Sequence, residues 1–198
     1  MSTIIIPASH EPQPYYERPL NIRNAKRIKM MWAWNMENVG PGEGWVDFWI
    51  ELKRDVGPRE GGWNARDETW LIYEPGKTTN DGLQYMQGYL NSPEQKNFAK
   101  IGGVTVEPGR GGVWVEAGGG NRTAHGSLTI PGPRYNTEAR TFWERRLGGA
   151  YTGYKPGQKF HLTVKLFQLD HPRAGFAGPH GHELGEHRWE NLFEIEEW

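Results

Sequence analysis

The sequence predicts an all-β protein, a two-sheet β-sandwich of jelly-roll type with one or two short helices in a long connection. Segments 45–52 and 160–169 alternate apolar side chains with other side chains, which is the pattern of a strand with one buried face. The 27 glycines and 14 prolines among 198 residues indicate many turns between short elements. Ten tryptophans and no cysteine indicate a core of large aromatic side chains without disulfides.

The chain is predicted to divide into an extended N-terminal arm, residues 1–27, and a single sandwich domain, residues 28–198. Regular structure in the arm is disfavoured by four prolines: Pro7, Pro12, Pro14 and Pro19. Ile4–Ile6 can nevertheless add a short edge strand. Met1–Ile6 has a three-residue apolar run and no basic region before it, so we expect no secretory signal and a protein made in the cytoplasm. No apolar run approaches the roughly 18 residues of a membrane span.

Segments 28–35 and 45–52 are predicted to form a β-hairpin, joined by the glycine-rich residues 36–44. One face of the first strand carries Ile28, Met30, Trp32 and Trp34. The core face of the second strand carries Val46, Phe48, Ile50 and Leu52, and its opposite face carries Trp45, Asp47, Trp49 and Glu51. Since both faces of the second strand hold large side chains, we expect its sheet to cover something on each side: a second sheet, a ligand or another subunit.

A third strand is predicted at Thr69–Glu74, followed by the long connection with helices at 81–90 and 93–100. Ser92 and Pro93 are typical of a helix start, and Gly102–Gly103 of a helix end. Residues 170–185 are predicted to form a loop rich in Gly, His and Pro. The remaining strands, which bring the total to about nine, are predicted at 104–107, 113–116, 127–130, 140–146, 160–169 and 189–198.

The first candidate site is the face of Trp45, Asp47, Trp49 and Glu51. Indoles stack on sugar rings and carboxylates bind hydroxyl groups, so this face can be a carbohydrate-binding surface. The alternatives are a site for another ligand and a face packed under a loop, the helix or another subunit. Asp47 and Glu51 stand about 13 Å apart along the strand, whereas glycosidase carboxylates stand about 5–9.5 Å apart. A glycosidase would need Asp47 with a carboxylate such as Glu74 or Glu116. We predict no catalytic residue, and a non-enzyme is favoured.

The second candidate site lies in the segment His-Gly-His-Glu-Leu-Gly-Glu-His, residues 180–187. Its pattern resembles the first half of the cupin metal motif. The resemblance implies His180, His182 and Glu186 as ligands of a divalent Zn, Fe, Mn or Ni ion in a metal-dependent enzyme. The glycine that follows the glutamate in that motif is replaced here by His187. The alternative is a solvated polar loop, in which case the protein has no cofactor.

The two ends of the chain carry opposite charge. Five basic residues gather near the N-terminus: Arg18, Arg23, Lys26, Arg27 and Lys29. Glutamates dominate after residue 182. The net charge of −1 provides no general basic field for nucleic acid. Opposite charges would set the register of docking within one chain or between neighbours. We expect the arm to contact a neighbouring subunit through Arg18, Arg23, Lys26 and Arg27.

The arm, the two-faced aromatic sheet and the oppositely charged ends together resemble single jelly-roll capsid or virion structural proteins. This resemblance is architectural and transfers no site residue. It implies a structural subunit that associates with itself into a viral capsid or a similar homo-oligomeric particle, and hence a location in the virion. The alternatives are a carbohydrate-binding sandwich, lectin-like or glycosidase-like, and a cupin-like metal enzyme.

Overall fold

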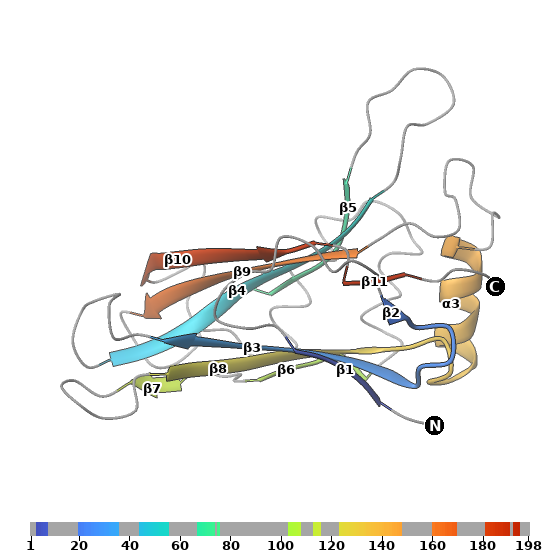
Figure 1. The fold of residues 1–198 in the computed structure, drawn as a ribbon, viewed down its shortest axis with the longest axis horizontal. Coiled ribbons are helices and arrows are strands. Elements are labelled where there is room, and N and C mark those ends of the chain that lie inside the picture. Colours follow the sequence, from blue (N-terminus) through green and yellow to red (C-terminus); the bar gives the residue numbers. More distant parts are fainter. Residues whose placement is uncertain are drawn as a thin grey trace, which may run out of the picture.

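The structure, a computed structural model, describes residues 3–7, 20–35, 44–55, 67–73, 75, 103–107, 113–115, 123–147, 160–169, 181–190 and 192–194. These residues form two β-sheets packed face to face, a small third sheet and a helix (Figure 1). The predicted two-sheet β-sandwich is therefore confirmed, whereas its jelly-roll topology stays a prediction. The predicted helices at 81–90 and 93–100 lie outside the described residues.

One layer of the sandwich is a four-stranded sheet in the order β1-β3-β8-β6. Its strands are β1 (Thr3–Pro7), β3 (Arg27–Asn35), β8 (Thr123–Pro131) and β6 (Thr105–Glu107). The β3–β8 and β6–β8 pairs are antiparallel, and β1 adds to the free side of β3 in parallel. The predicted edge strand at Ile4–Ile6 is thus confirmed, and it pairs within its own chain.

The other layer is a five-stranded sheet in the order β10-β9-β4-β5, with β7 also paired to β4. Its strands are β10 (Gly181–Trp189), β9 (Phe160–Leu169), β4 (Gly44–Asp55), β5 (Asp67–Tyr73) and β7 (Val113–Val115). One side of β4 follows β9 along Val46–Arg54, and the other side pairs first with β7 and then with β5. The long strand β4 is therefore the central strand of this layer, paired with neighbours on both sides.

The predicted hairpin of segments 28–35 and 45–52 is wrong, because β3 and β4 belong to different sheets. Their apolar faces were assigned correctly, since all eight core-face side chains of the two strands are buried. In a hairpin the two apolar stripes would lie on the same side of one sheet. Here they oppose each other across the interior, where the Trp32 and Phe48 rings meet edge to face with centroids 5.4 Å apart. Sheets pack about 10 Å apart, a distance that the eight residues between the strands can span.

Gly126 makes room for this aromatic contact. It pairs with Trp32 across the β3–β8 ladder, and a Cβ atom at Gly126 would lie 2.5 Å from Trp32 Nε1 and 2.7 Å from Phe48 Cε2. The Trp32 indole N–H has no hydrogen-bond partner in the structure, so packing alone fixes the ring. A side chain at position 126 would therefore push the two sheets apart or displace the indole.

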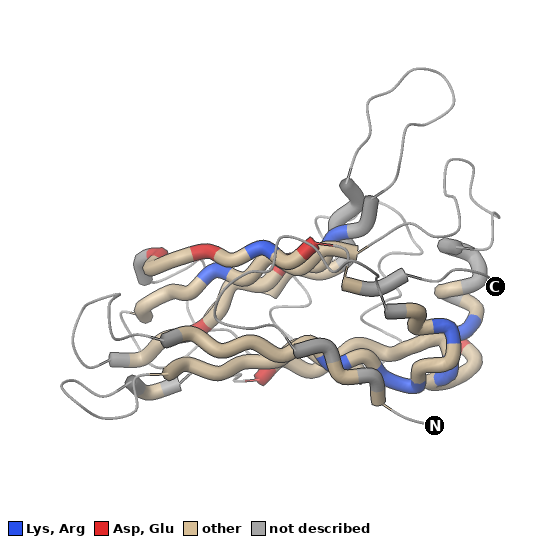
Figure 2. Tube along the Cα trace, in the orientation of Figure 1, with Lys and Arg blue, Asp and Glu red and all other residues tan. Residues whose placement is uncertain are grey.

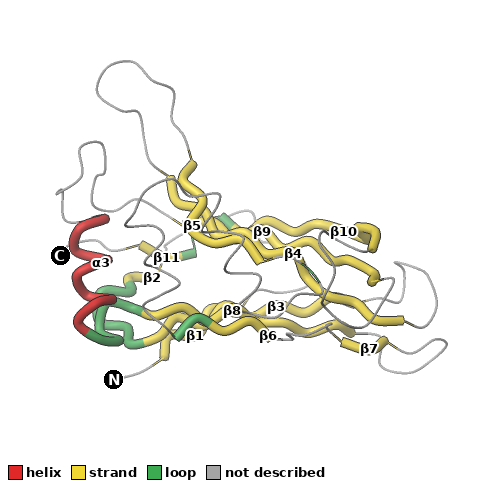
Figure 3. Tube along the Cα trace, turned by 180° about the vertical axis from the view of Figure 1, so that it is seen from behind, coloured by secondary structure: helices red, strands yellow, loops and turns green. Residues whose placement is uncertain are grey.

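Helix α3 (Thr137–Leu147) stands across one end of the sandwich (Figure 3). The predicted strand at 140–146 is therefore wrong. Asn136 caps the helix, because its Oδ1 accepts a hydrogen bond of 2.7 Å from Ala139 N. The buried Trp143 anchors it: its Nε1 donates to Pro131 O at 3.1 Å, and its ring meets that of Phe160 edge to face at 5.8 Å. A local cap and one tryptophan thus override the strand pattern.

The two ends of the described chain meet in a two-stranded parallel sheet. Strand β11 (Phe193–Glu194) pairs with β2 (Leu20–Asn21), and Leu192 N donates to Phe160 O at 2.9 Å. The acidic C-terminal segment therefore returns beside the basic N-terminal segment within one chain. Residues 181–185 lie in β10, so the predicted loop at 170–185 ends earlier than expected; its residues 170–180 lie outside the described part of the chain.

Replacing Gly126 with alanine should lower the free energy of unfolding by about 1–3 kcal/mol, the usual cost of overpacking a core. Gly185→Ala is the matched control, because a Cβ there would approach the Trp34 ring only to 3.2 Å and should cost less. Urea denaturation followed by tryptophan fluorescence measures both. Equal losses in the two variants would contradict the assigned role of Gly126.

Candidate functional site

The face of β4 that carries the two tryptophans and two carboxylates is as predicted, but it is not an open platform. Asp47 is fully buried and Glu51 is 9% exposed, while Trp45 and Trp49 are half-buried. The opposite face of β4 packs in the core, so both faces of this strand bury side chains, as the sequence predicts. The carboxylates are therefore not displayed to a sugar in this structure.

Hydrogen bonds hold the buried carboxylate of Asp47 in place. Its Oδ1 accepts from Phe48 N at 2.8 Å, and its Oδ2 accepts from the hydroxyl of Tyr73 at 3.3 Å. Position 47 lies between the stretch of β4 that pairs with β7, which ends at Val46, and the stretch that pairs with β5, which begins at Ile50. The Tyr73 side chain thus links the end of β5 to this gap. Burial, together with the Asp47 carboxylate, raises the pKa of the Tyr73 phenol above its usual range.

The remaining residues of this face also have neighbours. Lys53 Nζ lies 2.7 Å from Glu51 Oε1. Lys165 Nζ lies 4.9 Å from the centre of the Trp49 ring and 3.7 Å from Glu186 Oε2, which joins β4, β9 and β10. The Trp45 ring meets that of Trp114 on β7 edge to face at 5.4 Å, and Trp114 is 43% exposed. This face of the sheet is therefore packed, and the exposed indole of Trp114 lies at its end.

The predicted metal ligands are separated by a bulge. His180 lies outside the described residues, and of His182 only the backbone position in β10 is described. His182 pairs with Gln168, in the row of Val46, whereas Glu186 pairs with Lys165, in the row of Trp49. The register shift between Glu183 and Gly185 therefore places positions 182 and 186 in rows of opposite faces. Within the described part of the chain, no group of three His, Asp or Glu side chains could hold a metal ion.

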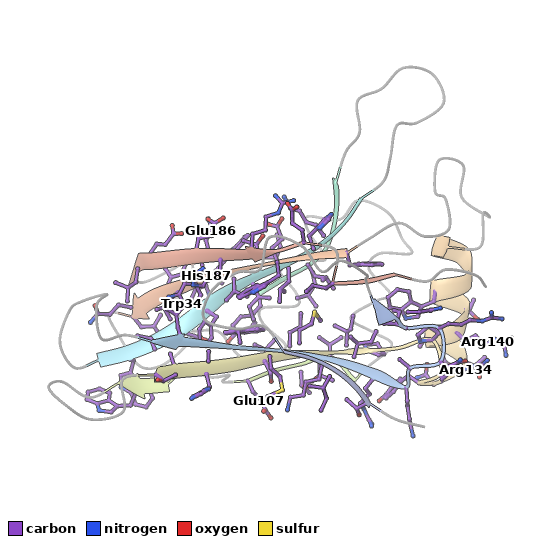
Figure 4. All side chains as sticks on the ribbon, in the orientation of Figure 1. Trp34, Glu107, Arg134, Arg140, Glu186 and His187 are labelled. Carbon is purple, nitrogen blue, oxygen red and sulfur yellow. The ribbon has the colours of Figure 1, made fainter. Side chains whose placement is uncertain are left out.

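His187 adopts a role that the motif did not suggest. Its ring stacks on that of Trp34 with centroids 4.0 Å apart and planes inclined by 24°. Trp34 comes from β3 and His187 from β10, so the stack bridges the two sheets (Figure 4). The histidine at this position is a packing residue of the sandwich interior.

Three of the four predicted arm-contact residues gather at the α3 end of the sandwich. Arg18 lies outside the described residues, whereas Arg23, Lys26 and Arg27 are exposed on the turn between β2 and β3 and at the start of β3. The Arg27 guanidinium lies 5.2 Å from the centre of the Tyr135 ring. Lys and Arg positions gather along the chain at this end of the molecule (Figure 2).

Two residues of this basic end were not predicted from the sequence, Arg134 and Arg140. They lie about a hundred positions after the arm and join it only because β8 pairs with β3. The sequence did contain a signal for the helix that carries Arg140, since Asn136 followed by Glu138 is typical of a helix start. It was missed because segment 140–146 was assigned to a strand.

The outer face of the four-stranded sheet carries the exposed apolar side chains of that layer. Ile5 on β1 is 55% exposed and Met31 on β3 is 40% exposed. The register places Ile5 beside Lys29 and Pro7 beside Met31, so Ile5 and Met31 are near neighbours on one face. This apolar pair lies at the edge of the sheet, because β1 is its terminal strand.

No protein-family model, curated protein or solved structure matches this chain. Among the described helical residues, none belongs to a helix with the length and hydropathy to cross a membrane.

The buried phenol of Tyr73 should make the protein lose stability in alkali. Because its native pKa is raised, its contribution is complete below about pH 10, the ordinary tyrosine pKa, and is lost above it, where only the unfolded phenol ionises. The free energy of unfolding should then fall by up to about 1.4 kcal/mol per pH unit from this group. Urea denaturation between neutral and alkaline pH should show a shallower fall for Tyr73→Phe than for the native chain.

Tyr135→Phe is the control, because it removes the hydroxyl of a half-buried tyrosine that stacks with Arg27 instead of facing a buried carboxylate. If Tyr73→Phe and Tyr135→Phe gave the same dependence on pH, the assignment to Tyr73 would be wrong.

Proposed function

We propose that this chain is a structural subunit that assembles with copies of itself, as a building block of a viral capsid or a similar homo-oligomeric particle. The observation that carries the proposal is the apolar, uncharged edge strand β1 with the exposed Ile5 and Met31 beside it. An exposed edge of this kind is a template for a strand of another chain.

Proteins that remain monomeric protect such edges with charged side chains, bulges or a covering loop. Strand β1, Thr-Ile-Ile-Ile-Pro, contains no charge. Its proline stands at its last position, so the preceding backbone N–H groups remain available for pairing. No described strand pairs with the free side of β1. A second copy seated there would gain ladder hydrogen bonds and cover Ile5.

The basic arm residues adjoin the free edge of β1, because Thr3 at the start of that strand pairs with Arg27. A second chain seated on this edge would lie beside them. Their position supports an arm that contacts a neighbouring subunit.

Replacing Ile5 with glutamate should reduce self-association to the monomer level, as measured by light scattering coupled to size-exclusion chromatography over a wide range of protein concentration. The added charge opposes pairing with a second chain. It should leave β1 in place within its own chain, because the cross-strand neighbour of Ile5 is Lys29.

The control is Thr105→Glu, which adds the same charge at an exposed position at the opposite edge of the sheet, in the same cross-strand row as Ile5. This variant should assemble like the native chain. A native chain that stays monomeric at every concentration, or an Ile5→Glu variant that assembles like Thr105→Glu, would overturn the proposal.

A further inference from the structure

A pocket lined by three arginines opens at the α3 end of the sandwich. Its described lining residues are Arg23, Pro133, Arg134 and Arg140, and its volume is about 200 Å³. Arg23 comes from the turn between β2 and β3, Arg134 from the turn between β8 and α3, and Arg140 from the start of α3. Arg134 and Arg140 project from the same end of the molecule (Figure 4), where basic residues gather (Figure 2).

The two turns that form the walls of the pocket are joined by their backbones. Arg134 N donates to Ala25 O at 2.9 Å, and Gly132 N donates to Lys26 O at 2.9 Å. A Cβ atom at Gly132 would overlap the carbonyl oxygen of Ala25, so only glycine permits this approach. Ala25 is itself buried. The backbones that carry Arg23 and Arg134 are thus held in fixed relation before any ligand binds.

The third wall is fixed by the helix. Arg140 N donates to Asn136 O at 3.0 Å, and the capping bond from Ala139 N to Asn136 Oδ1 holds the first turn. The buried Ala139 and Trp143 seat the helix against the sandwich. The backbone positions of the three arginines are thus set before a ligand binds, which reduces the entropy lost on binding.

The described residues that line the pocket include no acidic side chain. Within the described part of the chain, no carboxylate forms an ion pair with Arg23 or Arg134. Lys26 and Arg27 add positive charge nearby, and the acidic residue of the first turn of α3, Glu138, is not among the lining residues. Arg23 and Arg134 thus bring like charges to one pocket, and a bound anion relieves their repulsion.

We propose that this pocket binds the phosphate group of a ligand. Guanidinium groups present paired N–H donors that match phosphate oxygens, and those of Arg23 and Arg134 together suit a doubly charged phosphate better than a singly charged carboxylate. The volume of the pocket is about 200 Å³. It is smaller than the roughly 300–1,000 Å³ of pockets that enclose whole small molecules. The site therefore holds the phosphate group and leaves the rest of the ligand outside.

Calorimetric titration of the full chain with inorganic phosphate and with pyrophosphate, in low salt, tests the proposal. Fluorescence anisotropy of a labelled single-stranded oligonucleotide forms a second arm, which distinguishes a phosphodiester backbone from a free or terminal phosphate. Arg23→Gln and Arg134→Gln should each weaken binding about tenfold or more, since each removes a charge-assisted pair of hydrogen bonds. Arg134→Lys should fall between the native chain and Arg134→Gln, because it keeps the charge and loses the paired donors.

The control is Arg188→Gln on β10, which makes the same change in net charge at an exposed residue away from the pocket and should bind like the native chain. Arginine-dependent binding in either arm supports the proposal and identifies the source of the phosphate. The proposal is overturned if no phosphate compound binds or if the pocket variants bind like Arg188→Gln. The dependence of binding on Arg23 and Arg134 can be measured whether or not the chain assembles.

Discussion

The fold depends on the close contact of β3 and β4 across the sandwich interior. Trp32 and Phe48 meet there edge to face, and the absence of a side chain at Gly126 lets both rings enter the same layer. Because β3 and β4 lie near the middle of their sheets, this contact fixes the spacing and alignment of the two layers. The Trp34–His187 stack continues the same interior layer toward β10. An interior filled by rings tolerates little change in volume, so the sheets have few alternative ways to pack.

A second close contact lies at the α3 end of the sandwich, where two backbone segments, and not two rings, approach each other. Gly132 lets the turn after β8 touch the turn before β3, and Trp143 ties α3 to the last residue of β8. The three arginines of the pocket thus belong to segments whose separation is set by the core. A pocket built in this way is preorganised, because its shape is maintained by contacts that also stabilise the fold.

The period of two in β3, β4 and β9 revealed which side chains of these strands are buried, and every core-face residue predicted for β3 and β4 is buried in the structure. The partners of the strands could not be obtained in the same way. Alternation identifies a face, but it does not distinguish a neighbour in the same sheet from an opposing strand in the other sheet, and so β3 and β4 were mistaken for a hairpin. The local sequence at Asn136 did contain the helix signal, whereas the meeting of Arg23 with Arg134 is a product of topology alone. The bulge at Glu183–Gly185, which separates His182 from Glu186, is equally invisible to a motif.

The apolar edge and the basic pocket are connected through a short series of contacts. Thr3 of β1 pairs with Arg27, and Arg27 lies against Tyr135, the residue after Arg134. If two copies paired their β1 strands across a two-fold axis, the strands would run antiparallel, and the Thr3 end of one copy would lie beside the Pro7 end of the other. The basic turns of the two copies would then stand at opposite ends of the contact, and a phosphate held in one pocket would change the association little. In a head-to-tail contact the basic turn would meet a different surface of the neighbour, and a bound anion would weaken its attraction to acidic residues there. A phosphate effect on the proposed assembly would therefore favour the head-to-tail arrangement, because only that arrangement brings the pocket into the contact.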